Sequence, residues 1–163
     1  MFTKTYGIIS MFSYVLGNVD TSPNGILIDK VTGATTYTTF KVNGNSLPIP
    51  FRITSMIVNM FGNSGINGPF KGELNKCLKI IRKNAIAFAT CIQFVISEAP
   101  FDQPLLPNQF LNKYLRGGKQ EREIEMFYAR IAGEKGEELE NLIKKATSIE
   151  NMAQMPMRWC AWW

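Results

Sequence analysis

Residues 139–163 read LENLIKKATSIENMAQMPMRWCAWW, and this C-terminal stretch is the most informative part of the chain. Its first apolar residues recur at helical spacing and predict one apolar stripe on a short amphipathic helix. These residues are Leu139, Leu142, Ile143 and Ala146. Thr147 stands three residues before Glu150, and this capping-box arrangement predicts a second helix over residues 149–155.

The chain ends in an aromatic-rich segment with tryptophans at positions 159, 162 and 163. An indole ring has a large apolar area and an N–H group that needs a partner, so we expect this end to be buried. We predict that Trp159 and Trp162 pack on a helix over residues 120–132, near Phe127 and Ile131. Insertion of the tryptophans into a membrane interface, where indoles are favoured, is the weaker alternative.

The composition is that of a globular chain with one domain or slightly more. The 163 residues are 45% hydrophobic and 19% charged, with a net charge of +5. No long run of like charges occurs, so direct binding to nucleic acid is not expected. The absence of histidine excludes Ser–His and Cys–His nucleophile pairs and histidine-ligated zinc. Residues 85–97 form the longest apolar stretch and are too few to span a bilayer, which takes about 20 residues.

The remaining patterns predict a mainly α-helical fold with one small β-hairpin. A Thr-Gly turn separates two β-rich runs, residues 25–29 and 34–40. Asn84 interrupts an apolar period that begins near Phe70, so two packed helices are expected there. Further helices are expected over residues 5–17, 55–61, 109–115 and 120–132.

The order of residues near the C-terminus resembles the FATC motif, which closes the phosphatidylinositol 3-kinase-related kinases (the PIKK family). The residues that match its pattern are Leu142, Ile143, Ala146, Thr147, Asn151, Met152, Met155, Trp159 and Trp162. An ordinary amphipathic helix with an aromatic tail explains the stripe but not this order. The resemblance implies a helical hook whose last residues make structural or interaction contacts. Those residues are Trp159, Cys160, Trp162 and Trp163.

A second resemblance covers most of the remaining chain. A helix ending YVLG, a loop, a hairpin and the segment PIPFRIT follow one another, as in the C-terminal lobe of a PIKK kinase domain. Phe51 and Arg52 belong to this segment and are expected to make structural contacts. The resemblance implies a degenerate, protein-kinase-like C-lobe over residues 1–116, followed by terminal helices with the FATC motif over residues 119–163.

Alignment with the family loop places Asp20 at the catalytic aspartate, which orients the attacking hydroxyl in kinases. Gly25 falls on the asparagine and Thr39 on the DFG aspartate that hold magnesium in active members, although Asn24 lies one residue from the first position. Neither glycine nor threonine replaces these ligands, and Lys41 adds a positive charge where the metal binds. Because an aspartate in a proline-containing loop is usually a turn residue, we expect no confident catalytic residue, no metal and no cofactor.

Within the family, the loss of both metal positions resembles the TRRAP-type pseudokinase, a scaffold of histone acetyltransferase complexes in transcription. This implies a non-catalytic module that contacts protein subunits of a large nuclear complex and the remainder of its parent chain. The Gly-rich loop and the strand lysine that hold ATP in kinases do not precede Gly17, so the chain alone is not expected to be an enzyme. The alternative is the C-terminal fragment of a divergent active PIKK serine/threonine protein kinase, similar to TOR, with a cytoplasmic location.

Overall fold

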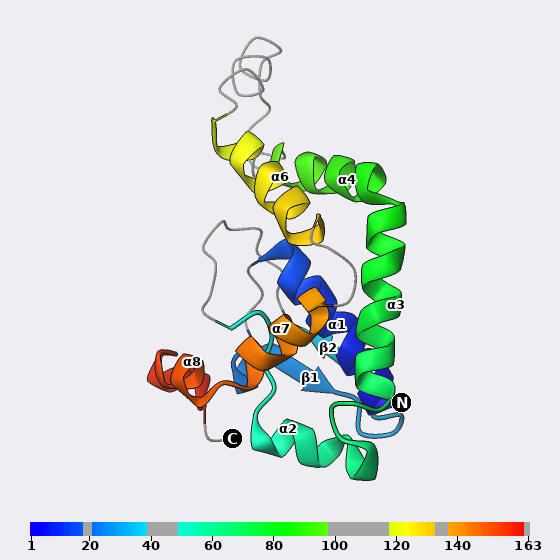
Figure 1. The fold of residues 1–163 in the computed structure, drawn as a ribbon, viewed down its shortest axis with the longest axis vertical. Helices are drawn as coiled ribbons and strands as arrows, with labels where there is room; N and C mark the ends of the chain where they lie inside the picture. The colour runs from blue at the N-terminus through cyan, green and yellow to red at the C-terminus, as the bar shows by residue number, and fades with distance from the viewer. Residues whose placement is uncertain (18–20, 39–48, 98–117, 133–136, 162–163) are drawn as a thin grey trace.

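The computed structural model describes residues 1–17, 21–38, 49–97, 118–132 and 137–161. These residues form a mainly helical fold with one antiparallel pair of strands, which confirms the predicted fold class (Figure 1). The helix expected over residues 109–115 lies outside the described residues.

The elements follow the predicted order along the chain. The helices and strands are α1 (Phe2–Leu16), β1 (Ile26–Ile28), β2 (Thr35–Tyr37), α2 (Ser55–Met60), α3 (Pro69–Lys83), α4 (Ala85–Ser97), α6 (Gly118–Ile131), α7 (Glu137–Thr147) and α8 (Ile149–Ala153). Short 3₁₀ turns lie at η1 (Pro23–Gly25), η2 (Gly62–Ser64) and η3 (Met157–Trp159). Across the described part of the chain, no helix combines the length and the apolar character needed to cross a membrane.

Helix α1 lies at the centre of the fold, where it contacts α3, β2 and α6 (Figure 1). Its Tyr6 is fully buried, and the ring centroid lies 6.2 Å from that of Phe70 on α3 and 5.9 Å from that of Phe61. Gly7 lets α1 and α3 approach closely, because a Cβ there would lie 3.0 Å from the Cβ of Glu73. The same cluster of buried side chains includes residues of α6, α7 and the C-terminal turn, so these segments share one core.

The predicted break at Asn84 is confirmed, since α3 ends at Lys83 and α4 begins at Ala85. The Asn84 side-chain amide donates to the carbonyl oxygen of Ile80 at 2.9 Å. The same carbonyl oxygen accepts the backbone N–H of Asn84 at 3.1 Å, so Asn84 closes the end of α3 through both its backbone and its side chain. The single long apolar period therefore becomes two helices that meet at a polar residue.

The hairpin is confirmed and is shorter than predicted, with Ile26 opposite Tyr37. Asp29 closes its turn, because the carboxylate accepts the backbone N–H of Thr32 at 2.6 Å and that of Val31 at 3.0 Å. Hydrogen bonds from Thr32, and then from Val31, hold the pKa of the Asp29 carboxyl below its usual value. Asp29 therefore has a structural role in the turn.

The start of α8 corrects one local prediction. Ser148, not Thr147, is the N-cap, because its side chain accepts the backbone N–H of Asn151 at 3.3 Å. The Thr147 hydroxyl instead donates to the carbonyl oxygen of Ile143 at 2.9 Å, within the last turn of α7. Helix α7 thus includes the residue that the capping-box pattern assigned to the start of the next helix.

Replacing Ser148 with alanine is expected to lower the free energy of unfolding by about 1 kcal/mol, because the cap bond to the first turn of α8 is lost. The matched change Thr147→Ala is expected to cost less, because alanine is the better helix former inside α7. Urea unfolding of the wild type and the two variants measures both effects. A larger loss in Thr147→Ala than in Ser148→Ala would contradict this assignment of the cap.

Candidate functional site

The loop after α1 contains the aspartate that the sequence assigned to catalysis. Helix α1 ends at Leu16, and its C-cap residue Gly17 has a left-handed conformation with φ 79°. The described part of the loop resumes at Thr21, which is buried together with Ser22. The carbonyl oxygen of Gly25 accepts the backbone N–H of Thr38 at 2.9 Å. This bond places Gly25 beside Thr38. The sequence alignment assigned Gly25 to the magnesium-binding asparagine, and Thr38 directly precedes Thr39.

The described residues do not form a magnesium site of the family's kind. Gly25 has no side-chain oxygen, and its neighbour Asn24 is exposed. Within the described ranges, no group of three or more His, Cys, Asp or Glu residues could hold a metal ion. Asp20, Thr39 and Lys41 lie outside those ranges. The described loop therefore offers backbone groups, the buried hydroxyls of Thr21 and Ser22 and one exposed amide, but no carboxylate ligand.

The C-terminal tail reaches this loop through Trp159. Trp159 is 4% exposed, and its indole N–H donates to the hydroxyl oxygen of Thr21 at 2.9 Å. The expected burial of Trp159 is confirmed, and its polar partners are Thr21 and Arg52, which the sequence did not predict. Trp159, Phe127 and Ile131 belong to the same cluster of buried side chains, and direct packing of the ring on the other two stays a prediction. A buried indole N–H needs an acceptor, which Thr21 supplies.

Arg52 also contacts the tail, through the Trp159 ring and through the backbone. Its guanidinium carbon lies 4.4 Å from the centre of the Trp159 ring, which is a cation–π arrangement. The same guanidinium donates through Nη1 to the carbonyl oxygen of Trp159 and through Nη2 to that of Cys160 at 2.9 Å. Among the described residues, Cys160 is the one non-glycine residue with a positive φ, of 50°. Arg52 therefore fixes a turn that most residues adopt only at an energetic cost.

Arg52 is itself held by the core. It lies between Phe51 and Ile53, each of which is 1% exposed. The hydroxyl of Tyr6 donates to the carbonyl oxygen of Arg52 at 2.9 Å. Burial lowers the pKa of the Arg52 guanidinium and raises the pKa of the Tyr6 phenol, which stays protonated and able to donate at neutral pH. A continuous path of contacts thus runs from α1 through Arg52 and Trp159 to the loop.

Helix α6 holds the other end of the loop through Arg130. Its Nη1 donates to the carbonyl oxygen of Val15 at 3.1 Å, and the hydroxyl of Tyr14 donates to the carbonyl oxygen of Arg130 at 3.2 Å. The guanidinium fills the space that a Cβ at Gly17 would occupy. Gly17 is therefore required both for its positive φ and for the close approach of Arg130. A cation also suits the C-terminal end of a helix, where the helix dipole is negative.

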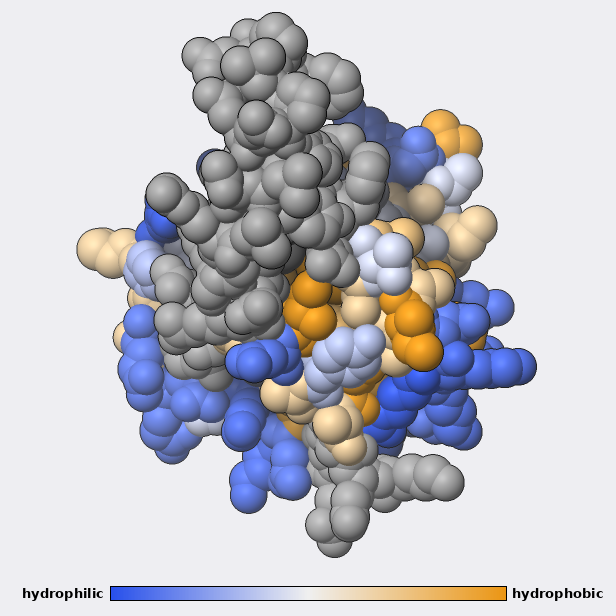
Figure 2. All heavy atoms as spheres, turned by 90° about the horizontal axis from the view of Figure 1, so that it is seen from above, coloured by the Kyte–Doolittle hydropathy of each residue, from blue (hydrophilic) through white to orange (hydrophobic). Residues whose placement is uncertain are grey.

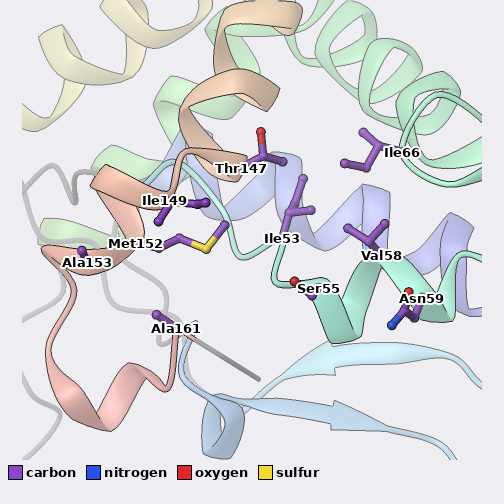
Figure 3. Close-up of a pocket in the computed structure, with 10 residues that line it drawn as sticks. All are labelled: Ile53, Ser55, Val58, Asn59, Ile66, Thr147, Ile149, Met152, Ala153 and Ala161. Carbon is purple, nitrogen blue, oxygen red and sulfur yellow. The ribbon is translucent and has the colours of Figure 1, made fainter.

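A groove of about 640 Å³ lies between α2 and the helices α7 and α8 (Figure 3). Its lining residues are Ile53, Ser55, Val58, Asn59, Ile66, Thr147, Ile149, Met152, Ala153 and Ala161. None of these side chains titrates, so the groove offers mainly apolar contact and no acid–base chemistry. The loop and the groove are therefore different in chemical character.

The sequence predicted structural or interaction contacts for six residues. Four of them are described by the structure: Phe51, Arg52, Trp159 and Cys160. The other two, Trp162 and Trp163, lie outside the described residues. The functional roles of these six residues stay predictions.

Sequence reasoning missed three residues that the structure joins to this region: Thr21, Tyr6 and Arg130. Thr21 stands where the family loop has arginine, and neither its type nor its spacing marks it as a partner of the tail. One feature of the sequence could have indicated the role of Arg130. It is a cation in the last turn of α6, beside the apolar positions Phe127 and Ile131.

The comparisons with known proteins decide the family. Residues 1–102 match the family of phosphatidylinositol 3- and 4-kinases, and residues 137–163 match the FATC domain. The chain belongs to the phosphatidylinositol 3- and 4-kinase family. Together with the FATC end, this makes the chain homologous to the PIKK kinases and confirms that part of the resemblance.

Two curated relatives and one solved structure illustrate the similarity. Serine/threonine-protein kinase MEC1 of Eremothecium gossypii is 26% identical over 99% of this chain, and serine/threonine-protein kinase TOR2 of Saccharomyces cerevisiae is 25% identical over 99% of it. The chain spans only 7% and 9% of the length of these relatives. The open conformation of CtTel1 shares the fold, with a TM-score of 0.80 and 24% identity over 99% of this chain and 6% of that one.

These comparisons contradict the expected TRRAP-type scaffold. MEC1 and TOR2 are named serine/threonine-protein kinases, so the interpretation as a pseudokinase that is not an enzyme is wrong. That interpretation rested on the residues at two positions, Gly25 and Thr39, whereas the similarity to these kinases extends along nearly the whole chain. The findings favour the alternative that the sequence left open, a divergent active PIKK kinase.

Proposed function

We propose that this chain is the C-terminal lobe and FATC end of the catalytic domain of a serine/threonine protein kinase. The observation that carries the proposal is the similarity to MEC1 and TOR2, which covers 99% of this chain and less than a tenth of either relative. A kinase active site also needs a nucleotide-binding half, with a Gly-rich loop and a lysine. We infer that the remainder of a longer chain supplies that half.

In this proposal Asp20 is the catalytic base. Phosphoryl transfer requires a carboxylate that orients the substrate hydroxyl and accepts its proton as the hydroxyl attacks the γ-phosphoryl group. Asp20 is the aspartate that directly precedes Thr21, the residue to which the tail bonds. The tail and the loop would then belong to one catalytic unit.

The proposed partners are the remainder of the parent chain and protein subunits bound to it. Figure 2 shows apolar side chains gathered among hydrophilic ones on the face seen from above. Apolar side chains gathered in this way support contact with further protein. The nuclear or cytoplasmic location, and the division between residues 1–116 and 119–163, stay predictions.

Replacing Asp20 with asparagine in the complete protein is expected to lower the rate of phosphate transfer to serine- and threonine-containing peptides by about 10²–10⁴-fold, because the base is lost. The measurement is radiolabelled phosphate incorporation by the affinity-purified complete chain, with magnesium and ATP at saturating concentration.

Asp29→Asn is the matched control, because Asp29 is an exposed aspartate of the hairpin turn and asparagine keeps a side-chain acceptor there. Its activity is expected to equal that of the wild type. A complete wild-type protein that transfers no phosphate, or an Asp20→Asn variant with full activity, would contradict the proposed function.

A further inference from the structure

We propose that the groove between α2 and the helices α7 and α8 is a docking site for a short, extended segment of a partner protein. The segment places apolar side chains in the groove and has acidic residues beside them. This role goes beyond phosphate transfer and does not depend on it. No charged side chain lines the groove, and the sequence has none from Ile53 to Phe70. A charged group inside the groove would lack a partner, so the part of the segment that enters is uncharged.

The wall that α8 forms is apolar and open. Ile149 is 79% exposed, and Met152 and Ala153 lie beside it on the groove (Figure 3). Covering these side chains with apolar groups of a partner removes apolar area from water, which is favourable. Met152 is unbranched and flexible, so it adapts to the shape of the side chains that enter.

The opposite wall, which α2 forms, supplies hydrogen-bonding groups. Ser55 and Asn59 line the groove and are exposed, and within the described ranges neither side chain forms a hydrogen bond. They are four residues apart on a helix, so they are separated by about 6 Å along its axis. In an extended chain, backbone groups that face the same side recur every two residues, or about 6.6–6.8 Å. The two side chains therefore match successive backbone groups of an extended segment.

Both walls are held by the fold, so the groove exists before a partner arrives. The side-chain amide of Asn151 donates to the carbonyl oxygen of Lys145 at 3.0 Å, which ties α8 to α7. On the other side, α2 follows Ile53 and Thr54, which are 1% and 0% exposed. A preformed site loses little conformational freedom on binding, which favours affinity for a short segment.

The charges next to the groove determine which residues flank the segment. Lys144 is exposed and lies three residues before the groove residue Thr147, so the two share a face of α7. Glu140, one turn further back on this face, is paired with Lys71 at 2.9 Å. Glu150 does not line the groove. A partner with acidic residues next to its apolar ones is therefore complementary to the cation at this end of the groove.

The test measures the binding of a fluorescein-labelled peptide to the complete protein by fluorescence polarisation. The probe has the centre Leu-Val-Leu-Leu with two aspartates at each end, and a second probe has lysines in place of the aspartates. Ala153→Trp fills the groove, Ile149→Asn makes its apolar wall polar, and Asn59→Leu removes the amide at similar size. Met157→Asn is the matched control, because Met157 is 84% exposed and does not line the groove.

The aspartate probe is expected to bind the wild type with a Kd in the micromolar range, because the contact is small. Ala153→Trp is expected to raise the Kd at least about tenfold, and Ile149→Asn and Asn59→Leu about fivefold each. Met157→Asn is expected to leave it unchanged. The lysine probe is expected to bind about two- to fivefold more weakly, and Lys144→Glu is expected to reverse the order of the two probes.

No binding of the aspartate probe to the complete wild type would overturn the proposal, because the groove would then not be open to a partner. Equal binding by Ala153→Trp and Met157→Asn would overturn the site, and equal binding of the two probes would overturn the acidic partner. Binding of phosphatidylserine vesicles that Ile149→Asn abolishes, without peptide binding, would assign the surface to a membrane instead. None of these measurements involves phosphate transfer, so their outcome is independent of the proposed kinase function.

Discussion

Replacing Trp159 with alanine is expected to lower the free energy of unfolding by about 3–5 kcal/mol, the usual cost of deleting a buried aromatic side chain. Trp159 is 4% exposed, stacks on Arg52 and donates to Thr21, so the change leaves a cavity and an unpaired hydroxyl. Chemical denaturation of this chain and its variant, followed by circular dichroism, measures the difference.

Met157→Ala is the control for this prediction. Met157 lies in the same 3₁₀ turn and is 84% exposed, so its loss is expected to stay within about 0.5 kcal/mol. Trp159→Phe is expected to fall between the two variants, because it keeps a ring and loses one hydrogen bond. Equal stability of Trp159→Ala and Met157→Ala, accompanied by liposome binding that depends on Trp159, would favour the membrane alternative instead.

Replacing Arg52 with methionine is expected to cost about 2–4 kcal/mol, because two carbonyl oxygens lose a charged donor and the cation–π contact is removed. Methionine is a flexible side chain that fills much of the same space, so the loss reports mainly on the polar contacts. The same denaturation experiment measures it.

Arg52→Lys separates charge from geometry in this prediction. Lysine keeps the charge but lacks the fork that bonds two acceptors at once, so an intermediate loss is expected. Arg158→Met tests an exposed arginine of the same tail and is expected to change stability by less than about 0.5 kcal/mol. An Arg52→Met variant no less stable than Arg158→Met would show that the guanidinium does not hold the tail.

The sequence predicted the local elements well because their signals are local. The apolar period of α3 and α4 breaks at Asn84, and the hairpin forms around the turn that Asp29 closes. The cap of α8 was misplaced by one residue because Thr147 and Ser148 are adjacent hydroxyl residues that can both cap a helix, and the capping-box spacing to Glu150 favoured Thr147. The choice depends on whether the Thr147 hydroxyl bonds back to α7, which spacing alone does not show.

The contacts that build the site could not be predicted in the same way. Trp159 and Thr21 are 138 residues apart in the sequence, and Arg52 and Trp159 are 107 residues apart. Burial of an aromatic end follows from its apolar area, but periodicity within one helix does not say which distant acceptor its N–H will reach. The prediction therefore gave the correct burial of Trp159 but not its polar partners, Thr21 and Arg52.

The most direct test of the account is a double-mutant cycle between Arg52 and Trp159, because the account claims that this pair joins the FATC tail to the kinase fold. Unfolding free energies are measured for the wild type, Arg52→Met, Trp159→Leu and the double variant. Residues in direct contact are expected to show a coupling energy of about 1–2 kcal/mol, so the double variant should lose less than the sum of the single losses. Losses that add to within about 0.3 kcal/mol would contradict the claim.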